Sequence, residues 1–109
     1  MAGVNSIKHK RVTTIGAGDE YKIKAYCGTI ILNERTNRPI TAIFMFTYIN
    51  QQLIAPDTVK MTNILGTSDR VNIGYNNSDG CVHIENKSSA DIKNLDIVII
   101  THADVEWDL

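Results

Sequence analysis

No apolar run in this sequence reaches about 18 residues, the shortest length that a membrane-spanning helix needs. The N-terminal stretch MAGVNSIKHKR lacks the apolar core of a secretory signal peptide. Its glycine stands at position 3, whereas N-myristoylation requires glycine directly after the initial methionine. We therefore expect a protein without a signal peptide that neither spans a membrane nor is anchored to one.

Cysteine and histidine are scarce, which argues against a metal site. Cys27 and Cys81 are too far apart to form a Cys-x-x-Cys pair, so the usual zinc and thioredoxin-like motifs are excluded. We expect two buried free thiols rather than a disulfide. No His-x-His pair of the kind found in cupin-type metal sites occurs among His9, His83 and His102. The sequence therefore predicts no metal and no cofactor.

Catalytic motifs are absent as well. The stretch Gly16–Gly18 lacks the third glycine and the following helix of a dinucleotide-binding fingerprint. No Gly-x-Ser-x-Gly motif occurs, and no nucleophile and base can be identified as a pair. The 11 basic and 12 acidic residues are spread along the chain, which gives no electrostatic reason to bind nucleic acid. We expect a protein that is not an enzyme and has no nucleic acid partner.

What the sequence does contain is a run that is apolar on both faces of a strand, Thr41–Asn50 (TAIFMFTYIN). One face would carry Ala42, Phe44, Phe46 and Tyr48, and the other Thr41, Ile43, Met45, Thr47 and Ile49. A strand with one face in water alternates apolar with polar residues. This run is therefore expected to be a central strand that is covered on both sides.

Shorter alternating segments surround this run, and turn residues separate them at intervals of about 8–12 residues. We expect about eight or nine short strands in an all-β fold, an antiparallel β-sandwich that is jelly-roll-like. Residues 1–109 would form one domain, with a loose lead-in at 1–6 and a C-terminal tail at 103–109.

Individual segments carry more detailed expectations. The basic residues of Ile7–Ile15 suit an exposed edge strand, because charge discourages edge-to-edge pairing. Further strands are expected at Thr58–Leu65 and Leu95–His102, and a loop at Leu53–Asp57. Gly28 is expected to mark a bulge or bend near the start of a strand.

The second half of the chain resembles a known family. The stretch Val82-His-Ile-Glu-Asn-Lys-Ser-Ser is similar to the late strand and turn of small β-sandwich heads in bacteriophage tail fibres and baseplate receptor-binding proteins. The resemblance covers roughly residues 20–102 as a pattern and includes no diagnostic motif. It implies a homotrimer in the virion, assembled in the host cytoplasm, that contacts other virion proteins and binds a host surface saccharide.

Apolar faces that one sandwich cannot bury support the same hypothesis. They occur at Thr41–Ile49 and Val98–Thr101, and symmetric packing of subunits would cover them. The leading interpretation is therefore a phage receptor-binding, or adhesion, head domain. The alternative is a structural virion or assembly protein with no ligand. A small cupin-like enzyme is the weaker third alternative.

Two loops are candidate ligand sites. The turn Asn76–Gly80 offers amide and carboxylate groups to paired sugar hydroxyls, although it is also a well-formed hairpin turn. Its candidate residues are Tyr75, Asn76, Asn77, Asp79 and His83. The loop Asn33–Pro39 carries Arg35 and Arg38, which suit an anionic glycan or a teichoic acid.

Trp107, close to the C-terminal end of the sequence, is a further candidate. A tryptophan in this position would stack on a sugar ring, fill a subunit contact or pack on its own domain. The sequence leaves these alternatives open.

Overall fold

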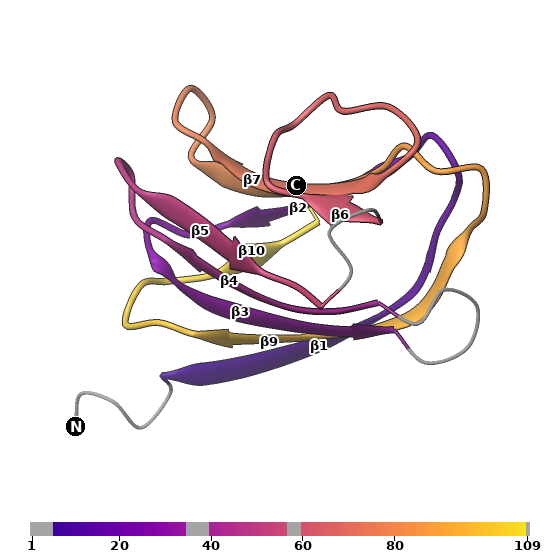
Figure 1. Ribbon diagram of the computed structural model, residues 1–109. Coiled ribbons are helices and arrows are strands. Elements are labelled where there is room, and N and C mark those ends of the chain that lie inside the picture. The colour runs from indigo at the N-terminus through magenta and orange to yellow at the C-terminus, as the bar shows by residue number, and fades with distance from the viewer. Residues whose placement is uncertain (1–5, 35–39, 57–59, 109) are drawn as a thin grey trace.

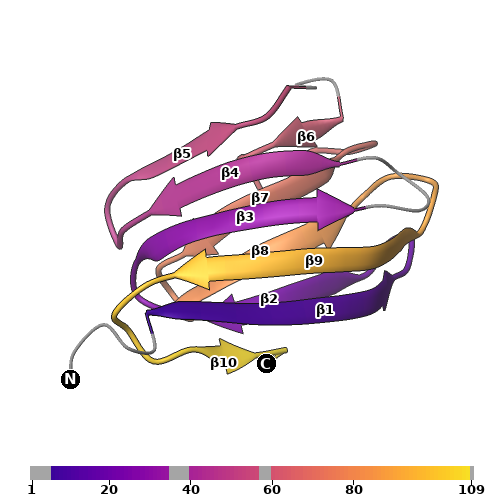
Figure 2. The ribbon, with the colours of Figure 1, turned by 90° about the horizontal axis from the view of Figure 1, so that it is seen from below.

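The computed structural model describes residues 6–34, 40–56 and 60–108, which form ten strands in two five-stranded sheets packed face to face (Figure 1, Figure 2). Sheet A has the order β1 (Ile7–Ile15), β9 (Ile92–Ile100), β3 (Gly28–Glu34), β4 (Thr41–Phe46) and β5 (Gln51–Ile54). Sheet B has the order β10 (Glu106–Trp107), β2 (Glu20–Lys24), β8 (Cys81–Asn86), β7 (Val71–Asn76) and β6 (Met61–Thr62). Within these ranges no helix is long and apolar enough to cross a membrane.

The predicted all-β sandwich is confirmed. Its jelly-roll-like feature is the pairing of early with late strands, because β1 pairs antiparallel with β9 and β2 pairs antiparallel with β8. The middle of the chain differs, since β3, β4 and β5 follow one another as a meander and the short β6 runs parallel to β7. The basic strand β1 lies at an edge of sheet A, as expected.

Three segments differ from the sequence-based prediction. A loop is predicted from Leu53, but Gln51–Ile54 is strand β5 because it pairs with the apolar β4. Of the strand predicted at Thr58–Leu65, the described part is extended only in β6. Glu106–Trp107, in the predicted tail, forms β10 by pairing with β2. The sandwich therefore has more strands than predicted.

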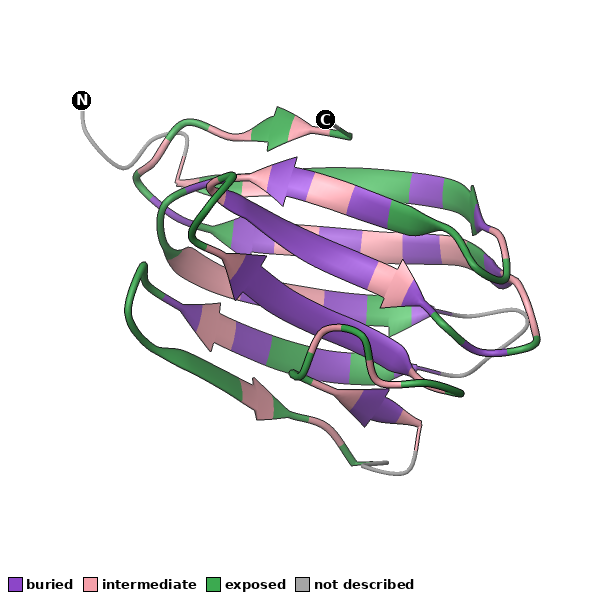
Figure 3. Cartoon of the chain, turned by 90° about the horizontal axis from the view of Figure 1, so that it is seen from above, coloured by how far each residue is buried: buried purple, intermediate pink, exposed green. Residues whose placement is uncertain are grey.

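The core lies between the sheets and consists of the inward-facing residue at every second position (Figure 3). Fully buried side chains from sheet A include Ile30, Phe44 and Ile97, and from sheet B Ile23 and Ile73. Burial of a side chain of this size contributes about 1.5–3 kcal/mol relative to exposure. This one layer of contacts holds the two sheets together.

The strand that begins at Thr41 is covered on one side only. Its inward residues Phe44 and Phe46 are buried, whereas Ile43 on the opposite face is 39% exposed. The prediction of a central strand covered on both sides is therefore wrong for a single chain. The sequence pattern was apolar on both faces, but sheet B covers only one of them.

The second half of the same run forms a hairpin turn rather than strand. The N–H of Thr47 donates to the carbonyl oxygen of Asn50 at 2.8 Å, which closes the turn between β4 and β5. Tyr48 and Ile49 stand exposed in this turn. Two large apolar side chains thus face solvent at one end of the sandwich.

The face of sheet A that is turned away from sheet B carries its side chains in rows across the strands. The first row consists of Ile54, Ile43, Ile31, Val98 and His9. The second consists of Gln52, Met45, Thr29, Ile100 and Ile7. The third is polar and consists of Thr41, Asn33, Asp96 and Arg11. We call the first row, together with Ile100 and Ile7 of the second row, the apolar face; the other members of the second row line a groove that is described below.

The two cysteines differ in exposure, which corrects the expectation of two buried thiols. Both are free, but Cys27 is exposed between β2 and β3 and only Cys81 is buried. Burial, followed by the nearby charge of Asp79, raises the pKa of the Cys81 thiol above its ordinary value. A protonated, buried thiol is a poor nucleophile.

We expect iodoacetamide to alkylate Cys27 in the native protein and to modify Cys81 at least about tenfold more slowly until the fold is opened by denaturant. Mass spectrometry of peptides after timed quenching measures both rates. A Cys27→Ser variant serves as the control and should show no fast phase. Equal rates at the two positions would contradict the burial of Cys81.

Candidate functional site

The turn between β7 and β8 uses its polar groups internally. The side-chain oxygen of Asn76 accepts hydrogen bonds from the N–H and the hydroxyl of Ser78, at 2.9 and 2.7 Å. One carboxylate oxygen of Asp79 accepts from the N–H of Cys81 at 2.9 Å. Gly80 has a φ of 70°, which a turn of this type requires. Most of the groups proposed for sugar binding are thus occupied by the turn itself, and Asn77 is left exposed at its tip.

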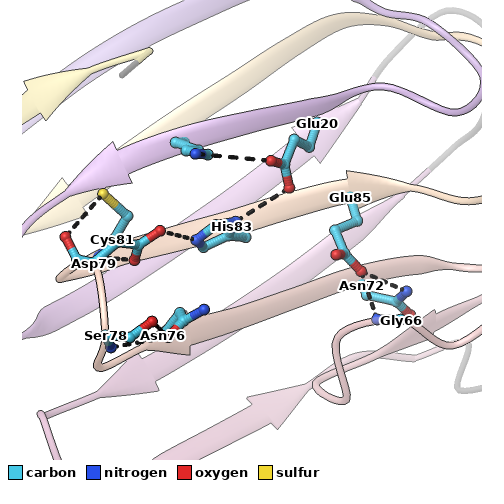
Figure 4. Close-up of polar contacts among 10 residues, drawn as sticks. Glu20, Gly66, Asn72, Asn76, Ser78, Asp79, Cys81, His83 and Glu85 are labelled. Carbon is cyan, nitrogen blue, oxygen red and sulfur yellow. Dashed lines mark hydrogen bonds and ion pairs between the residues drawn. The ribbon is translucent and has the colours of Figure 1, made fainter.

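His83 lies on β8 between two carboxylates (Figure 4). Its Nε2 is 2.7 Å from Asp79, and its Nδ1 is 3.1 Å from Glu20 on the neighbouring strand β2. The His83 side chain is only 10% exposed. The ring thus lies between carboxylates that belong to two different segments of the chain. The arrangement is therefore a clasp that joins the β7–β8 turn to β2.

The same clasp affects the acidity of Asp79. Desolvation favours the neutral carboxyl group, but the hydrogen bonds from the Cys81 N–H and from His83 outweigh it, so the pKa of Asp79 lies below its ordinary value. A carboxylate with a lowered pKa in the folded state stabilises the fold above its unfolded-state pKa. That contribution is lost as the pH falls through the folded-state pKa.

We expect the free energy of unfolding of the wild-type protein to exceed that of Asp79→Asn at pH 6, and the difference to shrink below about pH 4. Urea denaturation at both pH values measures it. The exposed Asp104 supplies the control, because Asp104→Asn should behave like the wild type at each pH. A difference between wild type and Asp79→Asn that stays constant down to pH 2 would contradict this account.

Other residues proposed from the sequence are not available to a ligand in the single chain. Tyr75 is buried, and its ring stacks on Phe46 with centroids 5.4 Å apart. Trp107 is half-buried, pairs with Ile23 and packs against the core, in line with the alternative that it packs on its own domain. Arg35 and Arg38 lie outside the described residues. Among the described residues of the proposed set, the structure joins the side chains of Asp79 and His83 directly, and Asn76 and Asn77 lie in the same turn as Asp79.

The loop between β6 and β7 covers part of the outer face of sheet B, over β7. The side chain of Leu65 lies over Gly74, where an added Cβ atom would come within 2.9 Å of it. The carboxylate of Glu85 accepts from the N–H of Gly66 at 2.7 Å and from the amide of Asn72 at 3.1 Å (Figure 4). This loop is held by specific contacts and leaves little free surface beneath it.

A groove that sequence reasoning missed lies on sheet A beside the β4–β5 turn. It has a volume of about 440 Å³ and involves three consecutive strands, β3, β4 and β5, together with that turn. Its lining residues are Gly28, Thr29, Met45, Phe46, Thr47, Asn50, Gln51 and Gln52. No described residue of this lining is charged.

The side chain of Gln51, which lines the groove, also ties the groove to sheet B. The amide nitrogen of Gln51 donates to the carbonyl oxygen of Tyr75 at 3.0 Å, and the amide oxygen accepts from the Tyr75 N–H at 2.9 Å. A side-chain amide thus replaces a strand neighbour for β7 at a point that the short β6 does not reach. The groove is therefore built on a strand that the Gln51 side chain holds against β7, rather than on a free loop.

Gly28 shapes the neighbouring wall. Its φ is 152°, and a Cβ atom there would come within 2.9 Å of the carbonyl oxygen of Ile100. The expected bend at the start of this strand is thus explained by close packing of β3 against the end of β9. No sequence signal identifies the groove, apart from the cluster Asn50, Gln51 and Gln52.

The arrangement can bind a ligand, but it offers no evident chemistry. Among the described residues, no group of three or more histidine, cysteine, aspartate or glutamate side chains is placed to hold a metal ion. The groove lining, as far as the structure describes it, includes no acid, base or thiol. Comparisons with known proteins add no functional information, because no family model, no curated protein and no solved structure matches the chain.

Proposed function

We propose that the protein is a non-catalytic, homo-oligomeric adhesion module that recognises a saccharide on a host surface as part of a virion. The β-sandwich is compatible with the resemblance to tail-fibre and baseplate heads. The observation that carries the proposal is the apolar face of sheet A, which the chain does not cover itself. Its exposed members include Ile7, Ile43, Ile54 and Ile100, at 68, 39, 50 and 43%.

A second copy of the chain fits this face. The face is centred on β3, the middle strand of five, so its rows extend over two strands on either side. At about 4.8 Å between strands and about 6.6 Å between rows, the first row covers about 160 Å² and the whole face about 220 Å² before side-chain relief is counted. That area is about a quarter of the roughly 800 Å² per partner in stable interfaces, so the polar row beside the face and the ends of the strands would supply the remaining contact.

The charges around the face also permit self-association. In the polar row beside it, the Nε of Arg11 donates to Asp96 at 2.7 Å, so neither charge stands unpaired toward a second copy. The net charge of the chain is −1, so repulsion between copies is weak. We expect a trimer, which is the state that the resemblance implies.

The oligomer is tested by light scattering coupled to size-exclusion chromatography at micromolar concentration. The wild type is expected to elute as a trimer, and Ile43→Lys as a folded monomer, because a lysine in the middle of the face would bury an unpaired charge. Ile64→Lys is the matched control, since Ile64 is an exposed isoleucine outside the apolar face. A monomeric wild type would contradict the proposal that a second copy of the chain covers the apolar face.

Saccharide recognition is tested separately by binding of the labelled oligomer to a glycan array. Binding to a defined set of glycans supports the adhesion function. An oligomer that binds no glycan would instead favour the alternative, a structural virion or assembly protein that uses the same face without a ligand.

A further inference from the structure

We infer that the groove between β3, β4, β5 and the β4–β5 turn binds a neutral saccharide. This inference rests on the proposed function, because it assigns a site and a ligand class to saccharide recognition. It differs from both loops proposed from the sequence, since the Asn76–Gly80 turn is occupied by its own hydrogen bonds and the arginine loop would select an anion.

The groove offers free donors and acceptors in pairs. Within the described residues, the side-chain amides of Asn50 and Gln52 form no hydrogen bond to the protein, and each presents both an N–H₂ group and an oxygen. The hydroxyl oxygen of Thr47 accepts from the N–H groups of Ile49 and Asn50 at 3.3 and 3.1 Å, which leaves its proton to donate. Adjacent sugar hydroxyls, which both donate and accept, match such groups.

Apolar surface accompanies these polar groups. Met45 and the buried ring of Phe46 contribute to the lining. Tyr48, in the turn between the lining residues Thr47 and Asn50, is 63% exposed and presents an aromatic surface that the fold does not use. The C–H face of a pyranose ring suits apolar and aromatic surface, whereas a fully polar ligand would leave this surface of the protein without an apolar partner.

The absence of charge in the lining sets the ligand class. A sialic acid or uronic acid would lose hydration at its carboxylate without gaining a cationic partner among the described lining residues. A neutral hexose or N-acetylhexosamine incurs no such penalty. The groove therefore discriminates against anionic glycans, in contrast to a site built around arginine.

The experiment is a titration of the isotope-labelled, intact protein followed by NMR of backbone and side-chain amides. The probes are the methyl glycosides of glucose, galactose and N-acetylglucosamine, sodium glucuronate, N-acetylneuraminic acid, and each glycan that the array shows to bind. We expect a neutral probe to shift the side-chain amide signals of Asn50 and Gln52, and the two anionic probes to shift neither.

Two variants test the residues. The double variant Asn50→Ala with Gln52→Ala should weaken binding by at least about tenfold, since each lost hydrogen bond to a neutral group reduces affinity several-fold. Tyr48→Ala should weaken it to a similar extent if the ring contacts the sugar. Asn77→Ala, an exposed asparagine on the neighbouring turn, is the matched control and should bind like the wild type.

The outcomes separate this inference from the proposed function. Shifts confined to the Asn76–Gly80 turn, or binding that survives the double variant, would place the saccharide elsewhere and leave adhesion intact. Stronger binding of the anionic probes would overturn the ligand class alone. No binding of any saccharide, on the array or by NMR, would overturn both proposals.

Discussion

Replacement of Asn86 by alanine is expected to lower the free energy of unfolding by about 3 kcal/mol. Asn86 is fully buried at the end of β8, and its amide nitrogen donates to the carbonyl oxygens of Ile15 and Ala90 at 2.9 and 2.8 Å. Its oxygen accepts from the hydroxyl of Ser88 at 2.6 Å. Alanine would remove the side-chain partner of the Ile15 carbonyl and of the Ser88 N–H, whereas the Ser88 hydroxyl keeps its bond to the Ala90 carbonyl. Each buried group left without a partner costs about 1–3 kcal/mol.

The chain supplies a matched control for this prediction. Asn76 forms the same turn with Ser78 at the end of β7, but it is only half-buried. Asn76→Ala should therefore cost less than about 1 kcal/mol, because water can satisfy the groups it leaves. Urea denaturation of both variants measures the difference. Similar losses at the two positions would show that the turn, and not its burial, determines the stability.

Phe44→Ala is expected to lower the free energy of unfolding by about 3–5 kcal/mol, the largest loss among the variants considered. Phe44 has no exposed surface, and its ring stacks on Phe46 with centroids 5.6 Å apart. Removing it leaves a cavity between the sheets that surrounding β-strands cannot easily close, because their positions are fixed by hydrogen bonds on both sides.

Ile64→Ala is the control for Phe44→Ala, since it removes a large apolar side chain from an exposed loop position. Its effect should stay within about 0.5 kcal/mol. Guanidinium denaturation monitored by tryptophan fluorescence measures both, because Trp107 is the one tryptophan of the sequence and packs against the core. A loss below about 1 kcal/mol for Phe44→Ala would contradict the burial of the Phe44 side chain between the sheets.

Strand positions could be predicted where local pattern and turn chemistry agree. The turn that begins at Gly16 marks the end of the strand Ile7–Ile15, and the basic composition of the strand predicts its position at an edge. The β7–β8 turn followed from Asp79-Gly80, which supplies a positive φ. In both segments neighbouring residues determine the local structure, and the tertiary packing agrees with it.

The turn after β4 could not be predicted in the same way. Thr47–Asn50 contains no glycine or proline, and its apolar residues continue the strand pattern of Thr41–Phe46. The Thr47 hydroxyl accepts from two N–H groups of this turn, and Gln51 ties the following strand to Tyr75, a contact between residues 24 positions apart. Sequence patterns of single strands do not include such contacts, and the groove that depends on them was missed for the same reason.

The clasp around His83 also depends on a contact between residues that are distant in the sequence. The sequence places His83 beside the β7–β8 turn, but its second carboxylate, Glu20, is 63 positions away. Only the pairing of β2 with β8 brings the two together. The nearness of Asp79 and His83 could therefore be predicted, while the internal hydrogen bonds that occupy them could not.

The pairing of β1 with β9 has a consequence for how the chain folds. Arg11 and Asp96, which face each other across this pair, are 85 residues apart in sequence. Until β9 is synthesised, both β1 and the inner edge of β3 expose unpaired backbone groups, because β9 lies between them in sheet A. Such non-local pairing makes folding slow, in the range of milliseconds to seconds. The nascent chain is therefore expected to complete sheet A only after most of it has left the ribosome, and to be most prone to aggregation before then.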